Sequence, residues 1–215
     1  MGGCPVRDHV QAMSDTASFR FCDESGGDGF GWIAEEPSAR CSHALASEGK
    51  VWLVDPLDFP EAIERALALG RPAGVLQLLD RHNRDCSALA ERLGVRRMVA
   101  PDEVFDSPFE CIPIARRRLW RESALWWPAT RTLVVADALG TNPFYTGGRA
   151  SLGVHLLLRL TPPAALGGHE PEHLLTGHGE GLHGLGTAHA VKLALSESRR
   201  RLPGVLLRLP FSARS

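Results

Sequence analysis

The sequence predicts an α+β fold, in which blocks rich in strands are separated by a few helices. Two short apolar runs, KVWLVD at residues 50–55 and GVLQLL at residues 74–79, have the composition of buried strands. Each is followed by a segment with helical spacing of apolar residues that ends at a glycine, at residues 59–70 and 87–94. Residues 96–137 offer four further strand candidates and no long helix, which indicates an antiparallel meander. Because strands and helices do not alternate strictly, we expect helices layered outside sheets.

The last third of the chain predicts at least one strand and one helix. For GVHLLLRL at residues 153–160, periodicity does not decide between a strand and a buried helix. Residues 172–186 begin as an apolar strand and become a glycine-rich loop. Residues 187–202 have the spacing of an amphipathic helix, and GVLLRLPF at residues 204–211 is a candidate last strand.

One domain is expected, because 215 residues with 44% hydrophobic content are enough for one well-buried core. Residues 1–28 show little periodic apolar pattern, so we expect a loosely ordered N-terminal arm followed by a single domain at residues 29–215. The glycines of GGDGFG at residues 26–31 precede any convincing strand. They therefore lack the context of a phosphate-binding turn, and no nucleotide cofactor is indicated.

The charge balance argues against two classes of partner. With 24 basic and 25 acidic residues, the formal net charge of −1 creates no overall field that would attract nucleic acid or an anionic membrane surface. No stretch approaches the ~20 uninterrupted apolar residues that span a bilayer, and the first residues lack the apolar core of a signal peptide. We therefore expect a cytoplasmic protein.

The cysteines predict neither a disulfide framework nor a cysteine zinc knuckle. Their number is odd, they are widely spaced, and no two form a C-x-x-C pair. We therefore expect reduced thiols that are mostly buried, at Cys4, Cys22, Cys41, Cys86 and Cys111.

Ionisable side chains gather where the first two predicted strands end. The first strand breaks at Asp55-Pro56, and such a break usually places the carboxylate at a sheet edge. The second leads into LLDRHNRDC at residues 78–86, which concentrates four such side chains: Asp80, His82, Arg84 and Asp85. In an arbitrary protein this segment is most often a solvated loop, so other landmarks must support a site.

Three landmarks do so by their order along the chain. The charged segment is followed by ALAERLG at residues 88–94, VVADAL follows at residues 134–139, and LLTGHG lies at residues 174–179. In this order and context the chain resembles the metallo-β-lactamase superfamily over about residues 45–200. The resemblance implies a four-layer αββα sandwich, with metal ions held between loops at the sheet edges and a water molecule activated for hydrolysis.

The metal-ligand pattern of the superfamily is incomplete in this chain. Laid against its H-x-H-x-D-H motif, residues 80–85 keep only the second histidine, His82, and Arg84 stands where the motif has aspartate. His178 and Asp137 match the late histidine and the bridging aspartate. The middle histidine should fall near residues 116–127, where Glu122 is the nearest residue able to bind a metal.

Two functions remain open at this point. The first is a protein with little or no catalytic activity and no cofactor, whose old cleft binds a small anionic ligand or a partner. In it Arg84 replaces one metal ion in an ion-pair network with Asp80, Asp85 and Asp137. The alternative is a hydrolase of esters, thioesters or phosphoesters that holds one zinc, iron or manganese ion. Its ligands would come from Asp80, His82, Asp85, Asp137 and His178, of which the last four are the metal candidates that we retain.

A third interpretation concerns the tryptophan-rich segment WRESALWW. Its aromatic side chains, Trp120, Trp126 and Trp127, fill a core or an interface more often than they line a ligand pocket. If they form an interface, the protein is a homodimer.

Overall fold

The first of two main sheets is built from the N-terminal half of the chain. The computed structural model describes residues 18–24, 28–148 and 150–202. The six strands of this sheet lie in chain order, with β1 to β4 antiparallel and β4, β5 and β6 parallel. They are β1 (Phe19–Cys22), β2 (Gly29–Ala34), β3 (Cys41–Ser47), β4 (Lys50–Val54), β5 (Arg71–Gln77) and β6 (Arg97–Val99).

The second sheet has five strands in the order β13-β12-β9-β8-β7. Strands β7, β8 and β9 form an antiparallel meander, β12 runs parallel to β9, and β13 closes the sheet antiparallel to β12. Their bounds are β7 (Glu110–Arg117), β8 (Trp120–Trp127), β9 (Thr132–Val135), β12 (His173–Thr176) and β13 (Leu182–His183). A small third sheet pairs β10 (Leu139–Gly140) with β11 (Gly153–Val154).

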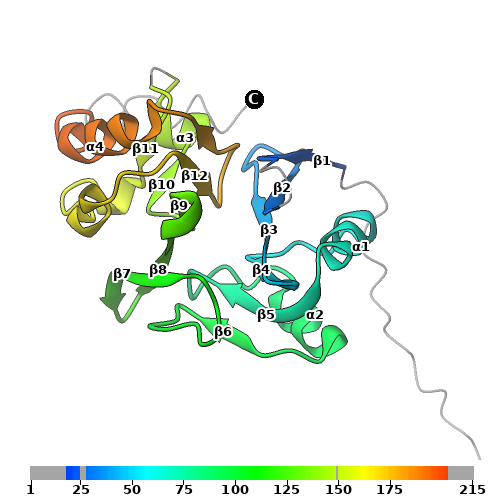
Figure 1. The fold of residues 1–215 in the computed structure, drawn as a ribbon. Helices are drawn as coiled ribbons and strands as arrows, with labels where there is room; N and C mark the ends of the chain where they lie inside the picture. The colour runs from blue at the N-terminus through cyan, green and yellow to red at the C-terminus, as the bar shows by residue number, and fades with distance from the viewer. Residues whose placement is uncertain (1–17, 25–27, 149, 203–215) are drawn as a thin grey trace, which may run out of the picture.

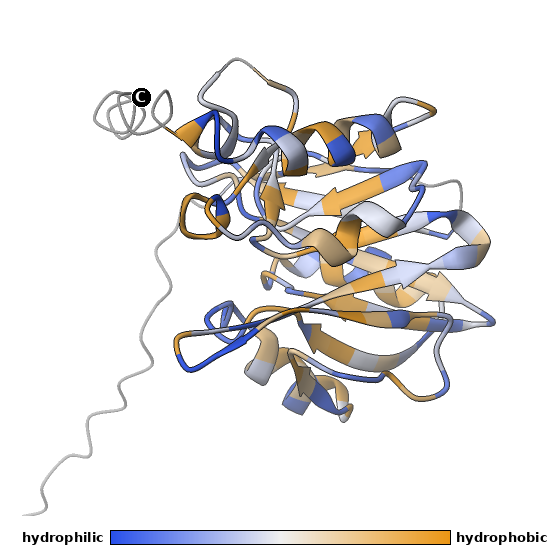
Figure 2. Ribbon diagram, turned by 90° about the vertical axis from the view of Figure 1, so that its left-hand side faces the viewer, coloured by the Kyte–Doolittle hydropathy of each residue, from blue (hydrophilic) through white to orange (hydrophobic). Residues whose placement is uncertain are grey.

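Helices lie on the outer sides of both main sheets (Figure 1). The described helices are α1 (Pro60–Ala68), α2 (Cys86–Leu93), α3 (Pro143–Thr146) and α4 (Thr187–Glu197). Figure 2 shows the longer helices outside strands that are mostly hydrophobic, whereas α3 packs against β10 and β11. The expected αββα sandwich is therefore confirmed. None of the described helices is long and apolar enough to cross a membrane.

Burial on both faces explains why β4 reads as a continuous apolar run. Val51 and Leu53 pack with α1 and α2, whereas Trp52 and Val54 point into the core between the two sheets. Successive side chains of a strand point to opposite faces, so a strand covered on both sides needs no polar alternation. α1 contributes the buried residues Ala62, Ile63 and Ala66 to the outer layer of this packing.

Three expectations from the sequence need correction or completion. The strand at residues 97–99 is not part of the meander, because β6 pairs with β5 in the first sheet. Part of the expected N-terminal arm is ordered, since β1 at residues 19–22 pairs with β2; residues 1–17 lie outside the described residues. Residues 153–160 form β11 and a short 3₁₀ helix, and the candidate strand at residues 204–211 lies outside the described residues.

The topology brings four loops together at one edge of the sandwich. Strands β4 and β5 are parallel, as are β9 and β12, so the loops after each pair leave the same end of their sheet. Two isolated bridges join the sheets there, Leu79 with Glu122 and Arg40 with His178. The charged segment, Asp137 and His178 all lie in loops at this edge.

Candidate metal centre

Three side chains from three different loops converge at this edge. His82 follows β5, Asp137 follows β9, and His178 follows β12. One ligand atom from each lies within 4.8 Å of the others. The Nε2 atom of His82 is 3.0 Å from Oδ1 of Asp137, and the Nε2 atom of His178 is 3.2 Å from the same oxygen. Two imidazoles and one carboxylate are a common ligand set for zinc and for other first-row metals.

The orientation of His82 is set by Asp55 at the end of β4. Asp55 is buried, and its Oδ2 atom lies 2.9 Å from Nδ1 of His82. Its other oxygen, Oδ1, accepts a hydrogen bond of 3.0 Å from the Leu78 N–H. When Nδ1 of His82 donates to Asp55, the lone pair of Nε2 is directed at the centre, as in histidine ligands held by a carboxylate.

The orientation of His178 is set by the backbone on each side of it. Nδ1 of His178 lies 2.8 Å from the carbonyl oxygen of Ser38, which leaves Nε2 directed toward Asp137. A Cβ atom at Gly177 would lie 2.7 Å from the Ala136 carbonyl oxygen, and one at Gly179 would lie 2.1 Å from Oγ1 of Thr141. Gly179 also has φ +90°. Glycine is therefore required on both sides of this histidine.

Glu122 binds the backbone at Asp137 and is not a member of the converging group. This fully buried carboxylate accepts the N–H groups of Asp137 and Ala138 at its Oε1 atom, at 2.9 and 2.8 Å. Its Oε2 atom accepts the indole N–H of Trp120 at 2.8 Å. Burial, together with the nearby Asp137 carboxylate, raises the pKa of Glu122 to about 7.

The protonation equilibria show that the centre attracts positive charge. Burial alone would lower the pKa of His82, but Asp55 and Asp137 raise it to about 9. Burial also opposes ionisation of Asp137, yet its contacts with His178 and His82 hold its pKa well below the usual range. Oδ1 of Asp137 is buried and has no partner with hydrogen-bond geometry among the described residues, although both Nε2 atoms are close to it. A cation bound between the three side chains would satisfy all of them.

Arg84 does not form the expected ion-pair network. Its guanidinium donates to the carbonyl oxygens of Cys41 and Asp55 at 2.5 and 2.7 Å, and to that of Gly177 at 2.9 Å. Within the described part of the chain it has no carboxylate within 4.0 Å, so the network with Asp80, Asp85 and Asp137 is not observed. Arg84 instead ties the first sheet to the loop after β12, because its planar fork fits carbonyl oxygens on both sides.

The comparisons with known proteins gave matches at the level of structure. No protein-family model and no curated protein matches the sequence. The crystal structure of the DIM-1 metallo-β-lactamase exposed to ceftazidime matches with a TM-score of 0.56 at 11% identity, covering 86% of this chain and all of that one. The chain has the metallo-β-lactamase fold.

Two further structures with this fold are similarly close. The metallo-β-lactamase from Pontibacter korlensis matches with a TM-score of 0.55 at 10% identity, covering 83% of this chain and 99% of that one. The mono-zinc form of the FIM-1 metallo-β-lactamase from Pseudomonas aeruginosa gives 0.57 at 12% identity, with 84% and 96% covered.

Two of the candidate residues in the loop after β5 lie apart from the converging group. Oδ2 of Asp85 accepts the N–H of Asp58 at 2.8 Å and so holds the loop before α1. Asp80 has one buried carboxylate oxygen, Oδ1, without a hydrogen-bond partner among the described residues. Neither joins His82, Asp137 and His178 in the group within 4.8 Å. In this metallo-β-lactamase fold, the loop therefore contributes one histidine to the converging group.

Tyr145 in α3 is a site residue for which the sequence gave no signal. It is buried, and its ring stacks on His178 with 5.9 Å between centroids. Burial, followed by the nearby charge of Asp137, raises its pKa well above the usual value. Only an N-cap pattern at Asn142 marks this short helix in the sequence.

The tryptophans of β8 are mainly core residues. Trp120 and Trp127 are each 5% exposed, whereas Trp126 is partly buried and packs beside His169, with 5.1 Å between ring centroids. The expectation that they fill a core is confirmed for Trp120 and Trp127. Whether the protein forms a homodimer stays a prediction.

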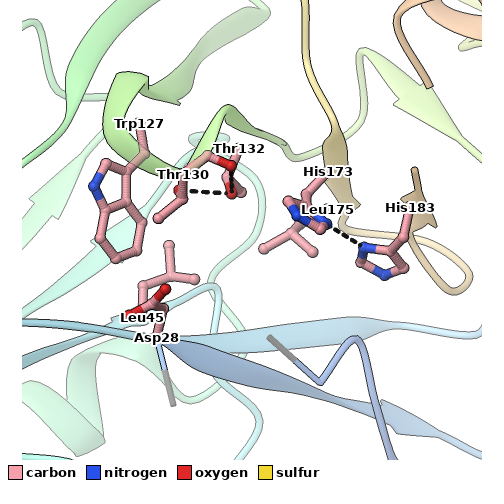
Figure 3. A pocket seen from close by; sticks show the side chains of 8 residues that line it. All are labelled: Asp28, Leu45, Trp127, Thr130, Thr132, His173, Leu175 and His183. Atoms are coloured by element: carbon pink, nitrogen blue, oxygen red, sulfur yellow. Dashed lines mark hydrogen bonds between the residues drawn. The ribbon is translucent and has the colours of Figure 1, made fainter. Parts of the chain in front are cut away.

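A cavity of about 300 Å³ lies between the two sheets at the opposite ends of β9 and β12 (Figure 3). Its lining includes Thr132 and His173, which begin these two strands. The candidate metal centre follows the other ends of the same strands, so the cavity and the centre are separate features of the fold.

Proposed function

We propose that this protein is a metal-dependent hydrolase with a single metal ion held by His82, Asp137 and His178. The observation that carries the proposal is the convergence of their three ligand atoms within 4.8 Å. Asp55 and Ser38 hold the outward-facing nitrogens of the two histidines, so both Nε2 atoms face the same carboxylate oxygen. Such secondary contacts are typical of histidine metal ligands.

The donor set fits zinc, iron or manganese with an open coordination position. Three protein ligands with N and O donors leave room for water, as in catalytic rather than structural sites. A metal ion bound there would supply Lewis-acid chemistry and lower the pKa of a bound water molecule, which suits hydrolysis of an ester, thioester or phosphoester. The polar oxygen of Asp137 that lacks a hydrogen bond is an independent sign of fit.

The side chains around the three ligands have supporting roles in this proposal. Asp55 fixes the ring of His82, and Glu122 holds the backbone N–H of Asp137 so that its carboxylate faces the two histidines. The loop after β5 offers no second set of ligands, because Asp85 is engaged with Asp58 and Arg84 with carbonyl oxygens. We therefore propose one metal ion rather than two at this edge of the sandwich.

The competing function is binding of an anion without catalysis. Its main support was a free guanidinium at Arg84, but three hydrogen bonds to carbonyl oxygens occupy the ends of that side chain. The position of Arg84 therefore favours the hydrolase over the anion-binding protein.

The proposal is tested by measuring metal content and hydrolysis in matched variants. His178→Ala should bind one equivalent of zinc less than the parent and lose hydrolysis of an ester, thioester and phosphodiester panel. The control is His189→Ala, which removes an exposed histidine from α4. Equal metal content in His178→Ala and the parent would refute the centre. If the metal is lost in His178→Ala but the parent hydrolyses none of the substrates, the metal centre is supported and the proposed hydrolase activity is rejected.

A further inference from the structure

A second group of metal-ligand side chains lies between the sheets, at the β1 side of the sandwich. Ligand atoms of Cys22, Asp23 and Cys41 lie within 4.8 Å of one another. The two sulfur atoms are 3.5 Å apart, and they lie 3.4 and 3.8 Å from Oδ2 of Asp23. Nδ1 of His43 is 3.9 Å from the same oxygen. None of these residues belongs to the candidate metal centre described above.

The register of the first sheet brings these side chains to one face. Cys22 of β1 pairs with Gly31 of β2, and Gly31 pairs with His43 of β3. Cross-strand partners point to the same face, as do Cys41 and His43, which are two residues apart in β3. A Cβ atom at Gly31 would lie 2.9 Å from Sγ of Cys22 and 3.0 Å from Nδ1 of His43. The glycine therefore leaves space between ligands from neighbouring strands.

Asp23 is held so that one oxygen faces the sulfur atoms. Its backbone has φ 51°, in the left-handed region, directly after the last residue of β1. Its Oδ1 atom accepts the Gly181 N–H at 2.8 Å and lies 3.0 Å from Nε2 of His183, which is drawn in Figure 3. These contacts leave Oδ2 directed toward Cys22, Cys41 and His43. Supporting contacts of this kind orient the ligands of metal sites.

The Nδ1 nitrogen of His43 is free to bind a metal ion, because no described residue forms a hydrogen bond with it. The side chain is 1% exposed, and its Nε2 atom lies 3.1 Å from the carbonyl oxygen of Thr176. When Nε2 carries the proton for that bond, Nδ1 presents a lone pair. Nδ1 is buried and has no hydrogen-bond partner among the described residues, and it faces a carboxylate. Two electron-rich atoms that face each other in a buried site need a cation between them.

We propose that Cys22, Asp23, Cys41 and His43 form a second metal site, which binds zinc. Around tetrahedral zinc, with bonds of about 2.0–2.3 Å, ligand atoms are about 3.3–3.8 Å apart. Among Cys22, Asp23 and Cys41, whose ligand atoms all lie within 4.8 Å of one another, the three separations of 3.4, 3.5 and 3.8 Å fall in this range. Nδ1 of His43 lies just outside this range, at 3.9 Å from Oδ2 of Asp23, and would complete the set. Two thiolates with an imidazole and a carboxylate select a borderline-soft ion such as zinc over magnesium or calcium.

The site has the features of a structural metal centre. All four side chains are almost fully buried, so no position is left open for a substrate. Bound zinc would connect β1 to β3 and, through Asp23, to the Gly181 N–H before β13. It would therefore hold the β1 edge of the first sheet in place beside the second sheet. This role is independent of hydrolysis at His82, Asp137 and His178.

Cobalt(II) substitution tests the site without reference to activity. Only thiolate ligands give a sulfur-to-cobalt charge-transfer absorption in the near ultraviolet, and the centre of His82, Asp137 and His178 contains none. The full-length parent with cobalt should show this absorption, and His178→Ala should retain it. Cys41→Ser should lose it, together with one equivalent of bound metal, whereas the matched control Cys111→Ser should retain both. His43→Ala should weaken cobalt binding.

If Cys41→Ser does not fold, two measurements on the parent still test the proposal: thiol alkylation followed by intact mass, and cobalt absorption. Intact mass with thiol alkylation should show five reactive cysteines after denaturation in a chelator. A mass lower by two hydrogen atoms, with Cys22 and Cys41 found as the unreactive cysteines by peptide mapping, would mean a disulfide between them and would overturn the proposal. Cobalt binding without charge-transfer absorption, or no binding beyond that lost in His178→Ala, would overturn it as well.

Discussion

Removal of the Glu122 carboxylate should destabilise the protein strongly, although this residue is not among the proposed ligands. Glu122→Ala leaves three buried donors without an acceptor: the N–H groups of Asp137 and Ala138 and the indole N–H of Trp120. Each buried donor left unsatisfied costs about 1–3 kcal/mol, so for three donors the free energy of unfolding should fall by roughly 3–9 kcal/mol. Metal affinity should fall too, because the Asp137 loop loses its anchor.

Urea unfolding of the metal-free protein measures this loss, with Glu122→Gln as the matched control. Glutamine keeps an acceptor for the two backbone N–H groups and turns its amide toward Trp120, so it leaves one donor unsatisfied. The loss for Glu122→Gln should therefore be about 1–3 kcal/mol, well below that for Glu122→Ala. Equal losses for the two variants, or a loss below about 1 kcal/mol for Glu122→Ala, would refute this account of Glu122.

Three further predictions follow from the same edge of the sandwich. The pKa of Glu122 is raised from 4.5 to about 7, so its protonation stabilises the folded protein fully below pH 4.5, and this stabilisation should be lost as the pH rises through about 7. Measurements of the free energy of unfolding across this pH range should show the loss in the parent and not in Glu122→Gln, which has no proton to lose. Gly179→Ala should destabilise more than Gly184→Ala in thermal unfolding, because both glycines have positive φ but only the first places a Cβ atom against Thr141. Arg84→Met should lower the free energy of unfolding, measured in urea, by about 1–3 kcal/mol, because the guanidinium donates to three carbonyl oxygens. Calorimetric titration should show no gain in zinc affinity, since Arg84 does not replace a metal ion. A gain in zinc affinity would restore the ion-pair model.

Local patterns carried much of the fold and part of the site. The apolar runs of β4 and β5, and the glycine that ends α2, predicted the first sheet and its outer helices, because burial and backbone conformation are local demands on sequence. The order of landmarks around His82, Asp137 and His178 predicted the sandwich and its edge. The glycines beside His178 were visible in the sequence, but the close contacts that require them were not.

Only the tertiary structure decided which side chains meet. It placed β6 in the first sheet, directed Arg84 toward carbonyl oxygens, and brought Cys22, Asp23 and Cys41 together, although the cysteine spacing predicted no cysteine zinc knuckle. The periodicity of a strand reports that its faces are buried, but not which strand becomes its neighbour or in which register. A long side chain such as that of Arg84 also reaches several acceptors equally well from its backbone position. Strand pairing and packing between sheets select one of these arrangements, because the backbone groups of each strand must pair with a neighbour while the apolar faces of both sheets are buried against each other.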